Sequence, residues 1–167
     1  DRPLSRVQMP RVEAMPQRAR GHQQHVRGLG HVAADLAGRG LDVIGVDPSP
    51  GMLAHARRLH PALPLVDGDA SLAALPDGPI AAILARFSLI HVEPGEVRST
   101  VRAWSALVDA GTPVLVAFQA ADEPGPPLAF DHAVAPAWRW HPDEFARVLA
   151  EAGFEEAWRI VVRDKDY

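Results

Sequence analysis

Short apolar runs and longer amphipathic segments alternate along this chain from about residue 30 onward. Apolar residues recur at helical spacing in four segments, several of them bounded by Ser, Pro or Gly, which predicts helices near residues 31–38, 50–59, 94–109 and 142–152. Continuous apolar runs predict buried strands at residues 42–47, 63–66, 80–84, 114–118 and 158–162. This order predicts an α/β fold in which helices cover a doubly wound, mostly parallel sheet.

One connection stands apart from this alternation. Residues 119–140 are rich in Pro and Ala and are too long for an idle loop in a compact domain. Trp138 and Trp140 lie at its end, each two residues from a proline, Pro136 and Pro142. We interpret them as a cap over a substrate, with ordinary packing of a long loop as the alternative.

The first 27 residues have a different character from the rest. They hold six arginines against two acidic residues, a balance of +4, which leaves −8 for the remainder of a chain whose net charge is −4. Their apolar residues are isolated rather than periodic, and three prolines interrupt them. We interpret residues 1–27 as a polar, Arg-rich segment that is disordered or aberrant, and residues 28–167 as the folded domain.

Composition narrows the range of functions. With 167 residues, 47% hydrophobic and 23% charged, the chain has the composition of a single soluble domain. It has no cysteine, which excludes disulfides, thiolate zinc sites and cysteine nucleophiles. Residues 28–167 are acidic overall, so they do not have the excess of basic residues that binds nucleic acid. No apolar run is long enough to span a membrane. His22 and His25 have a spacing that a metal could use, but they lack a third ligand, so we predict no metal site. From the composition we predict a cytoplasmic protein.

The candidate chemistry begins at Gly28. Gly28 and Gly30 open a predicted helix, and Asp47 ends the strand that follows it. A glycine turn before a helix, with an acidic residue about 20 residues later, is how an α/β sheet holds a nucleoside. Asp47 can accept hydrogen bonds from both ribose hydroxyls, and Asp69, after the next strand, can meet the exocyclic amine of an adenine. The alternatives are tight packing of a helix against a strand for the glycines and a turn carboxylate for Asp69.

Several motifs resemble one known family: Gly-Leu-Gly-His-Val-Ala from Gly28, Gly-Val-Asp-Pro-Ser-Pro-Gly-Met-Leu from Gly45, Gly-Asp-Ala from Gly68 and Phe-Ser-Leu-Ile-His from Phe87. Together they are similar to the small-molecule branch of the class I S-adenosylmethionine-dependent methyltransferases. The resemblance implies a Rossmann-like sheet of seven strands in the order 3-2-1-4-5-7-6. It also implies S-adenosylmethionine as cofactor, bound by Gly28, Gly30, Asp47, Pro48, Met52, Asp69, Ala70 and Arg86.

The chain departs from this family at both ends. Val26 stands where the family's first glycine belongs, Gln24 where its acidic residue belongs, and residues 20–23 are polar where a central strand should be buried. We therefore expect strand 1 to be missing or irregular and the family's last strand to be absent. Two explanations stay open. The reading frame or the sequence is broken before Gly28, or the segment is a true variant.

His91 is the only side chain after the fourth strand of the resemblance that could act as a general base near neutral pH. We predict for it a catalytic role or a structural role at the rim of the substrate pocket. The resemblance implies methyl transfer to an oxygen, nitrogen or carbon atom of a small molecule by in-line displacement. Two alternatives remain: a non-catalytic remnant or interaction domain that binds cofactor weakly or not at all, and an NAD-type dehydrogenase.

Overall fold

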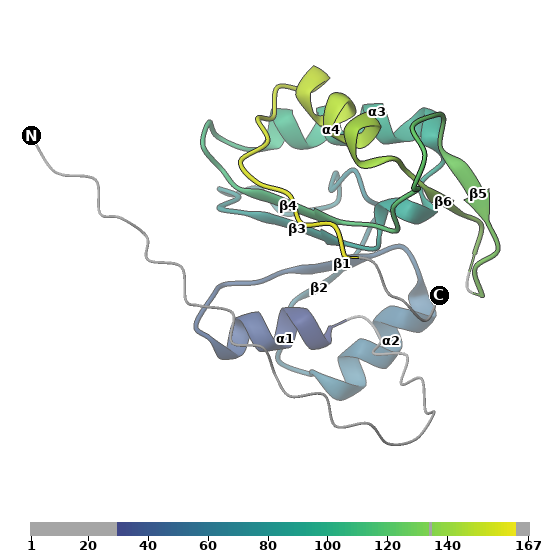
Figure 1. Ribbon diagram of the computed structural model, residues 1–167. Helices are drawn as coiled ribbons and strands as arrows, with labels where there is room; N and C mark the ends of the chain where they lie inside the picture. Colours follow the sequence, from purple (N-terminus) through teal and green to yellow (C-terminus); the bar gives the residue numbers. More distant parts are fainter. Residues whose placement is uncertain (1–29, 134, 163–167) are drawn as a thin grey trace, which may run out of the picture.

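The computed structural model describes residues 30–133 and 135–162, and Figure 1 shows their course. The helices are α1 (His31–Gly38), α2 (Pro50–Leu59), α3 (Pro94–Leu107) and α4 (Pro142–Glu151), with a 3-10 turn, η1 (Leu89–His91). The strands are β1 (Gly45–Asp47), β2 (Leu65–Asp67), β3 (Ile83–Arg86), β4 (Val114–Ala117), β5 (Leu128–Phe130) and β6 (Ala137–Arg139).

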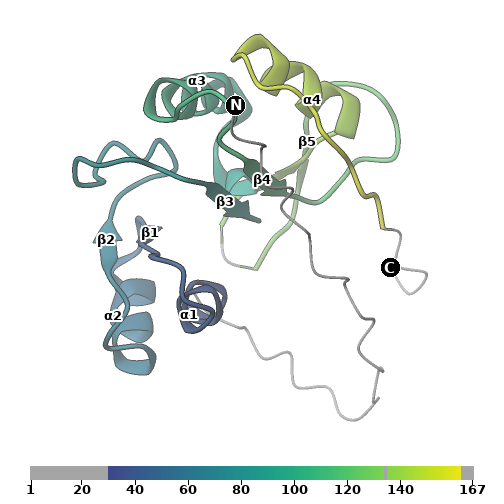
Figure 2. The same cartoon turned by 90° about the vertical axis from the view of Figure 1, so that its left-hand side faces the viewer.

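The strands form three pairs. β1 pairs with β2 and β3 pairs with β4, both in parallel, while β5 and β6 form an antiparallel hairpin. Among the described residues no ladder joins β1 to β3, so the parallel sheet is interrupted between them (Figure 2). The prediction of an irregular first strand concerns residues 20–27, which lie outside the described part of the chain.

Helices lie on both sides of the parallel strands. In Figures 1 and 2, α3 and α4 cover one face of β3 and β4, whereas α1 and α2 lie beside β1 and β2 on the other side. This arrangement confirms the predicted doubly wound, Rossmann-like α/β fold. All four predicted helices are present, and α1 and α2 have the predicted bounds.

Local sequence explains why α2 begins where it does. Ser49 precedes the helix in an extended conformation, and its Oγ accepts a hydrogen bond from the Met52 amide at 3.4 Å. Pro50 occupies the first helical position, where its missing N–H costs nothing. Leu53 and Ala56 are buried one turn apart, so this helix is anchored by one narrow face.

The main core lies between α3, α4 and the β3–β4 pair. Nine buried residues form it: Ile83, Ala85, Leu89, Val97, Val101, Trp104, Trp140, Phe145 and Val148. Ile83 and Ala85 alternate with exposed residues along β3, as expected for a strand covered on one face. The other face of this pair carries Leu84, 42% exposed, in register with Leu115, 45% exposed.

Two expectations about the second half of the chain were wrong. Residues 158–162 form no strand, and Ile160 is 73% exposed. No strand of the described residues pairs with this segment, so β-propensity alone does not make it a strand. Residues 119–140, in which the sequence predicted no strand, contain the β5–β6 hairpin. The parallel strands are also shorter than predicted; β1, for example, begins only at Gly45.

Candidate functional site

The carboxyl ends of β1 and β2 bring the predicted acidic residues together. Asp47 and Asp67 are register partners at the ends of these parallel strands, and the Gly68 amide donates to the Asp47 carbonyl at 3.3 Å. Asp69 follows two residues after Asp67. The predicted ribose carboxylate and the predicted adenine carboxylate therefore lie on the same edge of the sheet, where ligands of open α/β sheets bind.

Asp47 is half-buried, and its carboxylate is only partly engaged. Its Oδ1 accepts a hydrogen bond from the Ser49 amide at 2.8 Å. No other described residue bonds to the Asp47 carboxylate, so the second oxygen is open to a ligand. A partly buried carboxylate in this state is a strong acceptor for hydroxyl donors.

Asp69 has a structural role of its own. Its Oδ1 accepts from the Ser71 amide at 2.9 Å and from the Ser71 hydroxyl at 2.5 Å. These two hydrogen bonds lower the pKa of Asp69 below its ordinary value, and the bond from the Ser71 hydroxyl has the larger effect. One oxygen of Asp69 is therefore a turn carboxylate, as in the alternative from the sequence, and no described residue hydrogen-bonds to Oδ2, which is left for a ligand.

Pro48, Met52 and Ala70, which the resemblance also assigned to the cofactor site, follow β1 and β2 at the same edge of the sheet. Pro48 is exposed directly after Asp47, and Met52 is half-buried in the first turn of α2. The Ala70 carbonyl accepts a hydrogen bond from Trp104 Nε1 at 2.7 Å, which ties the segment after β2 to α3. The loop that carries Asp69 is thus fixed by a core side chain.

Gly30 lies at the start of α1 in a left-handed conformation, with φ +105°. A Cβ there would lie 3.1 Å from His60 Cδ2 and 3.4 Å from Ala56 Cβ. The glycine therefore lets α1 approach α2 closely, so its packing partner is a helix and not the strand of the packing alternative from the sequence. Gly28, the other predicted glycine, lies outside the described residues.

The end of β3 carries an unusual backbone conformation that the sequence did not reveal. Phe87 has φ +54°, a region that bulky side chains rarely adopt, and its amide donates to the Ala117 carbonyl at 2.8 Å. Arg86 places its guanidinium carbon 5.0 Å from the centre of the Phe87 ring. Both side chains are exposed at the carboxyl edge, and strained residues of this kind cluster at functional sites.

His91 ends η1, immediately after this strained turn. Its Nδ1 lies 3.0 Å from the Pro136 carbonyl oxygen, and its ring lies 4.9 Å from that of His132 with an interplanar angle of 68°. Pro136 and His132 belong to the hairpin segment. The sequence analysis missed both contacts; the unusual length of residues 119–140 was the only signal for them.

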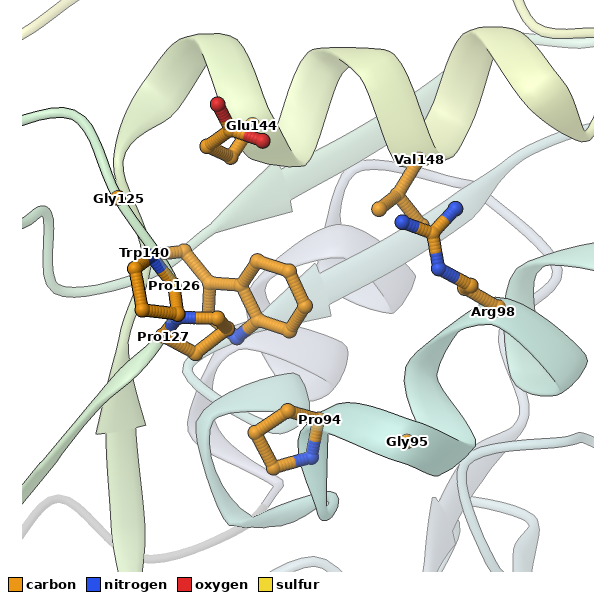
Figure 3. Close-up of a pocket in the computed structure, with 9 residues that line it drawn as sticks. All are labelled: Pro94, Gly95, Arg98, Gly125, Pro126, Pro127, Trp140, Glu144 and Val148. Carbon is orange, nitrogen blue, oxygen red and sulfur yellow. The ribbon is translucent and has the colours of Figure 1, made fainter.

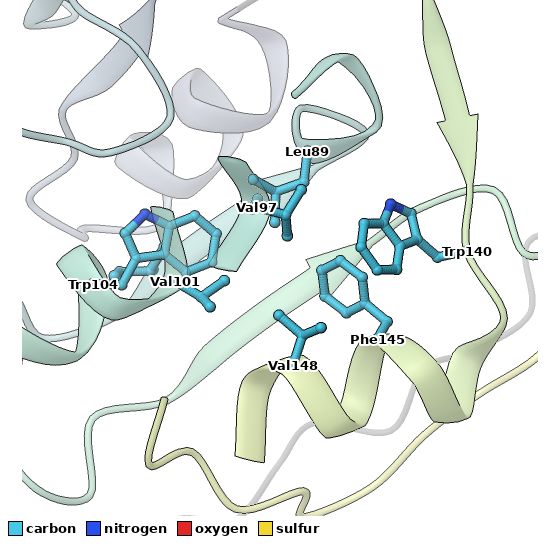
Figure 4. Close-up of a cluster of buried hydrophobic side chains, with 9 residues drawn as sticks. Leu89, Val97, Val101, Trp104, Trp140, Phe145 and Val148 are labelled. Carbon is cyan, nitrogen blue, oxygen red and sulfur yellow. The ribbon is translucent and has the colours of Figure 1, made fainter. Parts of the chain in front are cut away.

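A separate cavity of about 530 Å³ opens between α3, α4 and the Gly125–Pro127 loop. Figure 3 shows Arg98 on α3 and Glu144 on α4 near it, with Trp140 between them and the loop. None of the predicted cofactor residues lines this cavity. Trp140 is only 5% exposed and packs edge-on against Phe145 at 5.5 Å (Figure 4), so packing, rather than a substrate cap, accounts for it.

Neither a metal site nor a membrane-spanning helix is found among the described residues. No cluster of three His, Cys, Asp or Glu side chains there could hold a metal ion. No helix in residues 30–133 or 135–162 is long and apolar enough to cross a membrane.

The sequence profile described as "Methyltransferase domain" matches residues 27–111, just over half of the chain. This chain belongs to the methyltransferase domain family. The match spans every predicted cofactor residue together with His91. It confirms the resemblance to S-adenosylmethionine-dependent methyltransferases that the motifs indicated.

Individual relatives agree with this assignment. The demethylmenaquinone methyltransferase of Beutenbergia cavernae is 42% identical over 67 residues, which are 40% of this chain and 28% of that protein. A SAM-dependent methyltransferase of Methanosarcina mazei has a similar structure, with a TM-score of 0.65, 14% identity and 75% of both chains covered. The 1,6-didemethyltoxoflavin-N1-methyltransferase of Burkholderia thailandensis gives a TM-score of 0.58 and 23% identity over 74% of this chain and 55% of that one.

Proposed function

We propose that this chain binds S-adenosylmethionine at the carboxyl edge of β1, β2 and β3 and transfers its methyl group to a small molecule. The observation that carries the proposal is Asp47, a half-buried carboxylate with one oxygen to which no described residue hydrogen-bonds, beside the turn that holds Asp69. These carboxylates suit the donors of an adenosine: ribose hydroxyls for Asp47 and the exocyclic amine for Asp69. The Burkholderia relative was solved with S-adenosylhomocysteine bound, which supports this choice.

The other residues of the edge have supporting roles in this proposal. Met52 packs near the adenine, and Pro48, Ala70 and Arg86 line the cofactor site. Gly28 and Gly30 let the backbone approach the methionine portion. The packing of Gly30 against α2 is compatible with this role, because a close helix–helix approach at the start of α1 also fixes the turn before it.

The chemical step makes modest demands on the protein. The sulfonium of the cofactor supplies a methyl group that is already activated for displacement. The protein therefore has to hold the acceptor atom in line with the methyl group and exclude competing geometries. His91, half-buried at the end of η1, is placed to accept a proton from an acceptor that must lose one.

The acceptor we propose is a small molecule, methylated on oxygen, nitrogen or carbon. Relatives named for demethylmenaquinone and for 1,6-didemethyltoxoflavin support a small acceptor. A second candidate is a non-catalytic, methyltransferase-like domain. The interruption between β1 and β3 favours it, because among the described residues the cofactor edge rests on two separate strand pairs.

Calorimetric titration of the full chain with S-adenosylhomocysteine, and separately with NAD⁺, tests the proposal. We expect saturable binding of S-adenosylhomocysteine and weaker or no binding of NAD⁺. Tighter binding of NAD⁺ would indicate a dehydrogenase. The absence of binding by either compound would leave the non-catalytic domain as the function.

A further inference from the structure

The contact between His91 and the β5–β6 hairpin determines which nitrogen of the His91 ring carries the proton. Nδ1 of His91 lies 3.0 Å from the Pro136 carbonyl oxygen, 45 residues away in sequence. A carbonyl oxygen can only accept a hydrogen bond, so Nδ1 must carry the proton and donate it. In the neutral imidazole this leaves Nε2 without a proton and with its lone pair available.

Aromatic contacts from the same hairpin hold the His91 ring. His132 meets it edge-on, with ring centroids 4.9 Å apart, and Phe130 of β5 meets His132 at 5.8 Å with an interplanar angle of 86°. The guanidinium carbon of Arg139 lies 4.8 Å from the centre of the Phe130 ring. Because Phe130 and Ala137 are register partners, the hairpin ladder sets the spacing between these rings and the Pro136 carbonyl.

We propose that the hairpin, through the Pro136 carbonyl and the His132 ring, is a positioning device that holds His91 in its Nδ1–H tautomer. This inference rests on the proposed methyl transfer. Nε2 is then the atom that accepts a proton from the methyl acceptor, and Pro136 and His132 are positioning groups that touch neither acceptor nor cofactor.

This assignment narrows the acceptor to one with a weakly acidic O–H or N–H. As that bond breaks, its proton passes to Nε2 of His91 and its electron pair remains on the acceptor atom. The acceptor atom forms a bond to the methyl carbon, and the carbon–sulfur bond breaks with its electron pair going to sulfur, which becomes a neutral thioether. The proton then leaves the half-buried His91 for solvent.

Nitrogen-15 NMR of the full chain with labelled histidine tests the inference without any acceptor. We expect the His91 signals, assigned by their loss in His91→Asn, to show a protonated Nδ1 and an unprotonated Nε2 when the ring is neutral. His132→Ala should cause a loss of Nδ1–H population, whereas His132→Phe keeps a ring edge against His91 and should retain it. His55→Phe, on α2 and remote in sequence from the hairpin, serves as the control and should leave the His91 signals unshifted.

Two results would overturn the proposal: a protonated Nε2 on His91 in the parent chain, or an unchanged tautomer in both His132 variants. Titration of the same samples with S-adenosylhomocysteine separates this inference from the proposed function. Binding together with the wrong tautomer rejects the positioning role alone. The expected tautomer without binding rejects the proposed cofactor.

Discussion

The two halves of the described chain differ sharply in how they are held together. We call residues 30–82 the N-terminal half and residues 83–162, without 134, the C-terminal half. The N-terminal half contributes three of the buried hydrophobic residues, and α1 contributes none. The C-terminal half contributes twelve, including Trp104, Trp140 and Phe145 (Figure 4).

The difference matters because the halves hold different parts of the site. The proposed cofactor carboxylates, Asp47 and Asp69, lie in the N-terminal half, while His91 and the hairpin lie in the C-terminal half. Among the described residues, β1 and β2 form a two-stranded sheet, and such a sheet is at best marginally stable without further neighbours. The half that would bind the cofactor is thus the half with the weaker core.

The largest effect we expect comes from giving β1 a neighbour. In this prediction the first 27 residues contribute no strand, and a graft of an apolar strand ending in Asp-x-Gly-x-Gly onto Leu29 replaces them. A central parallel strand is buried on both faces, so polar residues at positions 20–25 would each need a partner there. Leaving even two such groups unsatisfied would cost on the order of 2–6 kcal/mol, which is why we expect no strand from the native segment. Melting temperature and S-adenosylhomocysteine affinity should both rise.

A second graft with two central prolines provides the control, because proline cannot complete the ladder of a central strand. It should give no gain in either quantity. If the parent chain already binds tightly and the apolar graft changes neither melting temperature nor affinity, the native segment is a working strand and the prediction is wrong.

Trp104→Ala should have the next largest effect, because Trp104 joins the two halves. It is 1% exposed in the core of the C-terminal half, and its Nε1 donates to the Ala70 carbonyl next to Asp69. Truncating a buried tryptophan costs about 3–5 kcal/mol in the free energy of unfolding. Chemical denaturation measures this cost. Trp158→Ala, at a 55% exposed position, is the matched control and should change stability by less than about 0.5 kcal/mol.

Trp104→Phe isolates the link between the halves. It keeps most of the apolar surface but leaves the Ala70 carbonyl without its donor, at a cost of about 1–3 kcal/mol. Because Ala70 follows Asp69, we expect a loss of S-adenosylhomocysteine affinity as well. Unchanged affinity in a folded Trp104→Phe would show that the loop needs no anchor from α3.

The same contrast explains how far the sequence could predict this molecule. Helices α1 and α2 were predicted at their observed bounds because Gly30, Ser49 and Pro50 mark their starts through backbone and capping chemistry. The shared edge of Asp47 and Asp69 was predictable because parallel strands end on the same side of a sheet. These signals are local, or they follow from topology alone.

The features that sequence reasoning missed depend on contacts between distant residues. β5 and β6 are three residues each, too short for a periodic pattern, and they are held by cross-strand pairing and by contact with η1. Residues 158–162 have strand composition, but a strand also needs a neighbour. The contact of His91 with Pro136 joins residues 45 positions apart in the sequence, and no sequence motif predicts it.

Asp47→Ala tests the N-terminal half directly. Losing a carboxylate that accepts from ribose hydroxyls should cost about 1.5–3 kcal/mol of binding free energy. Calorimetry with S-adenosylhomocysteine measures the change. Asp42→Ala is the matched control, because Asp42 is an exposed aspartate before the opposite end of β1. Equal affinities for the parent and Asp47→Ala would remove Asp47 from the site.

Ser71→Ala should have the smallest effect, and it separates the turn role of Asp69 from a ligand role. The Ser71 hydroxyl is the main cause of the lowered pKa of Asp69, so its loss should move that pKa up toward the ordinary value. A carboxyl with a lowered pKa stabilises the folded state above its unfolded pKa, and this contribution disappears as the pH falls through the folded pKa. The stability difference from the parent should therefore be at most about 1 kcal/mol at neutral pH, because Asp69 is exposed. In acid it should shrink to what remains from the second contact of Ser71, whose Oγ accepts a hydrogen bond from the Ala73 amide at 3.3 Å. Ser99→Ala is the control. It removes a hydroxyl that donates to the backbone carbonyl of Glu96 at 2.7 Å, and this carbonyl does not titrate. The cost of Ser99→Ala should therefore not depend on the titration of Asp69. Denaturation curves for both variants at neutral and acidic pH make the comparison; a Ser71→Ala cost that persists unchanged in acid would show that the hydroxyl serves the turn without acting through the Asp69 charge.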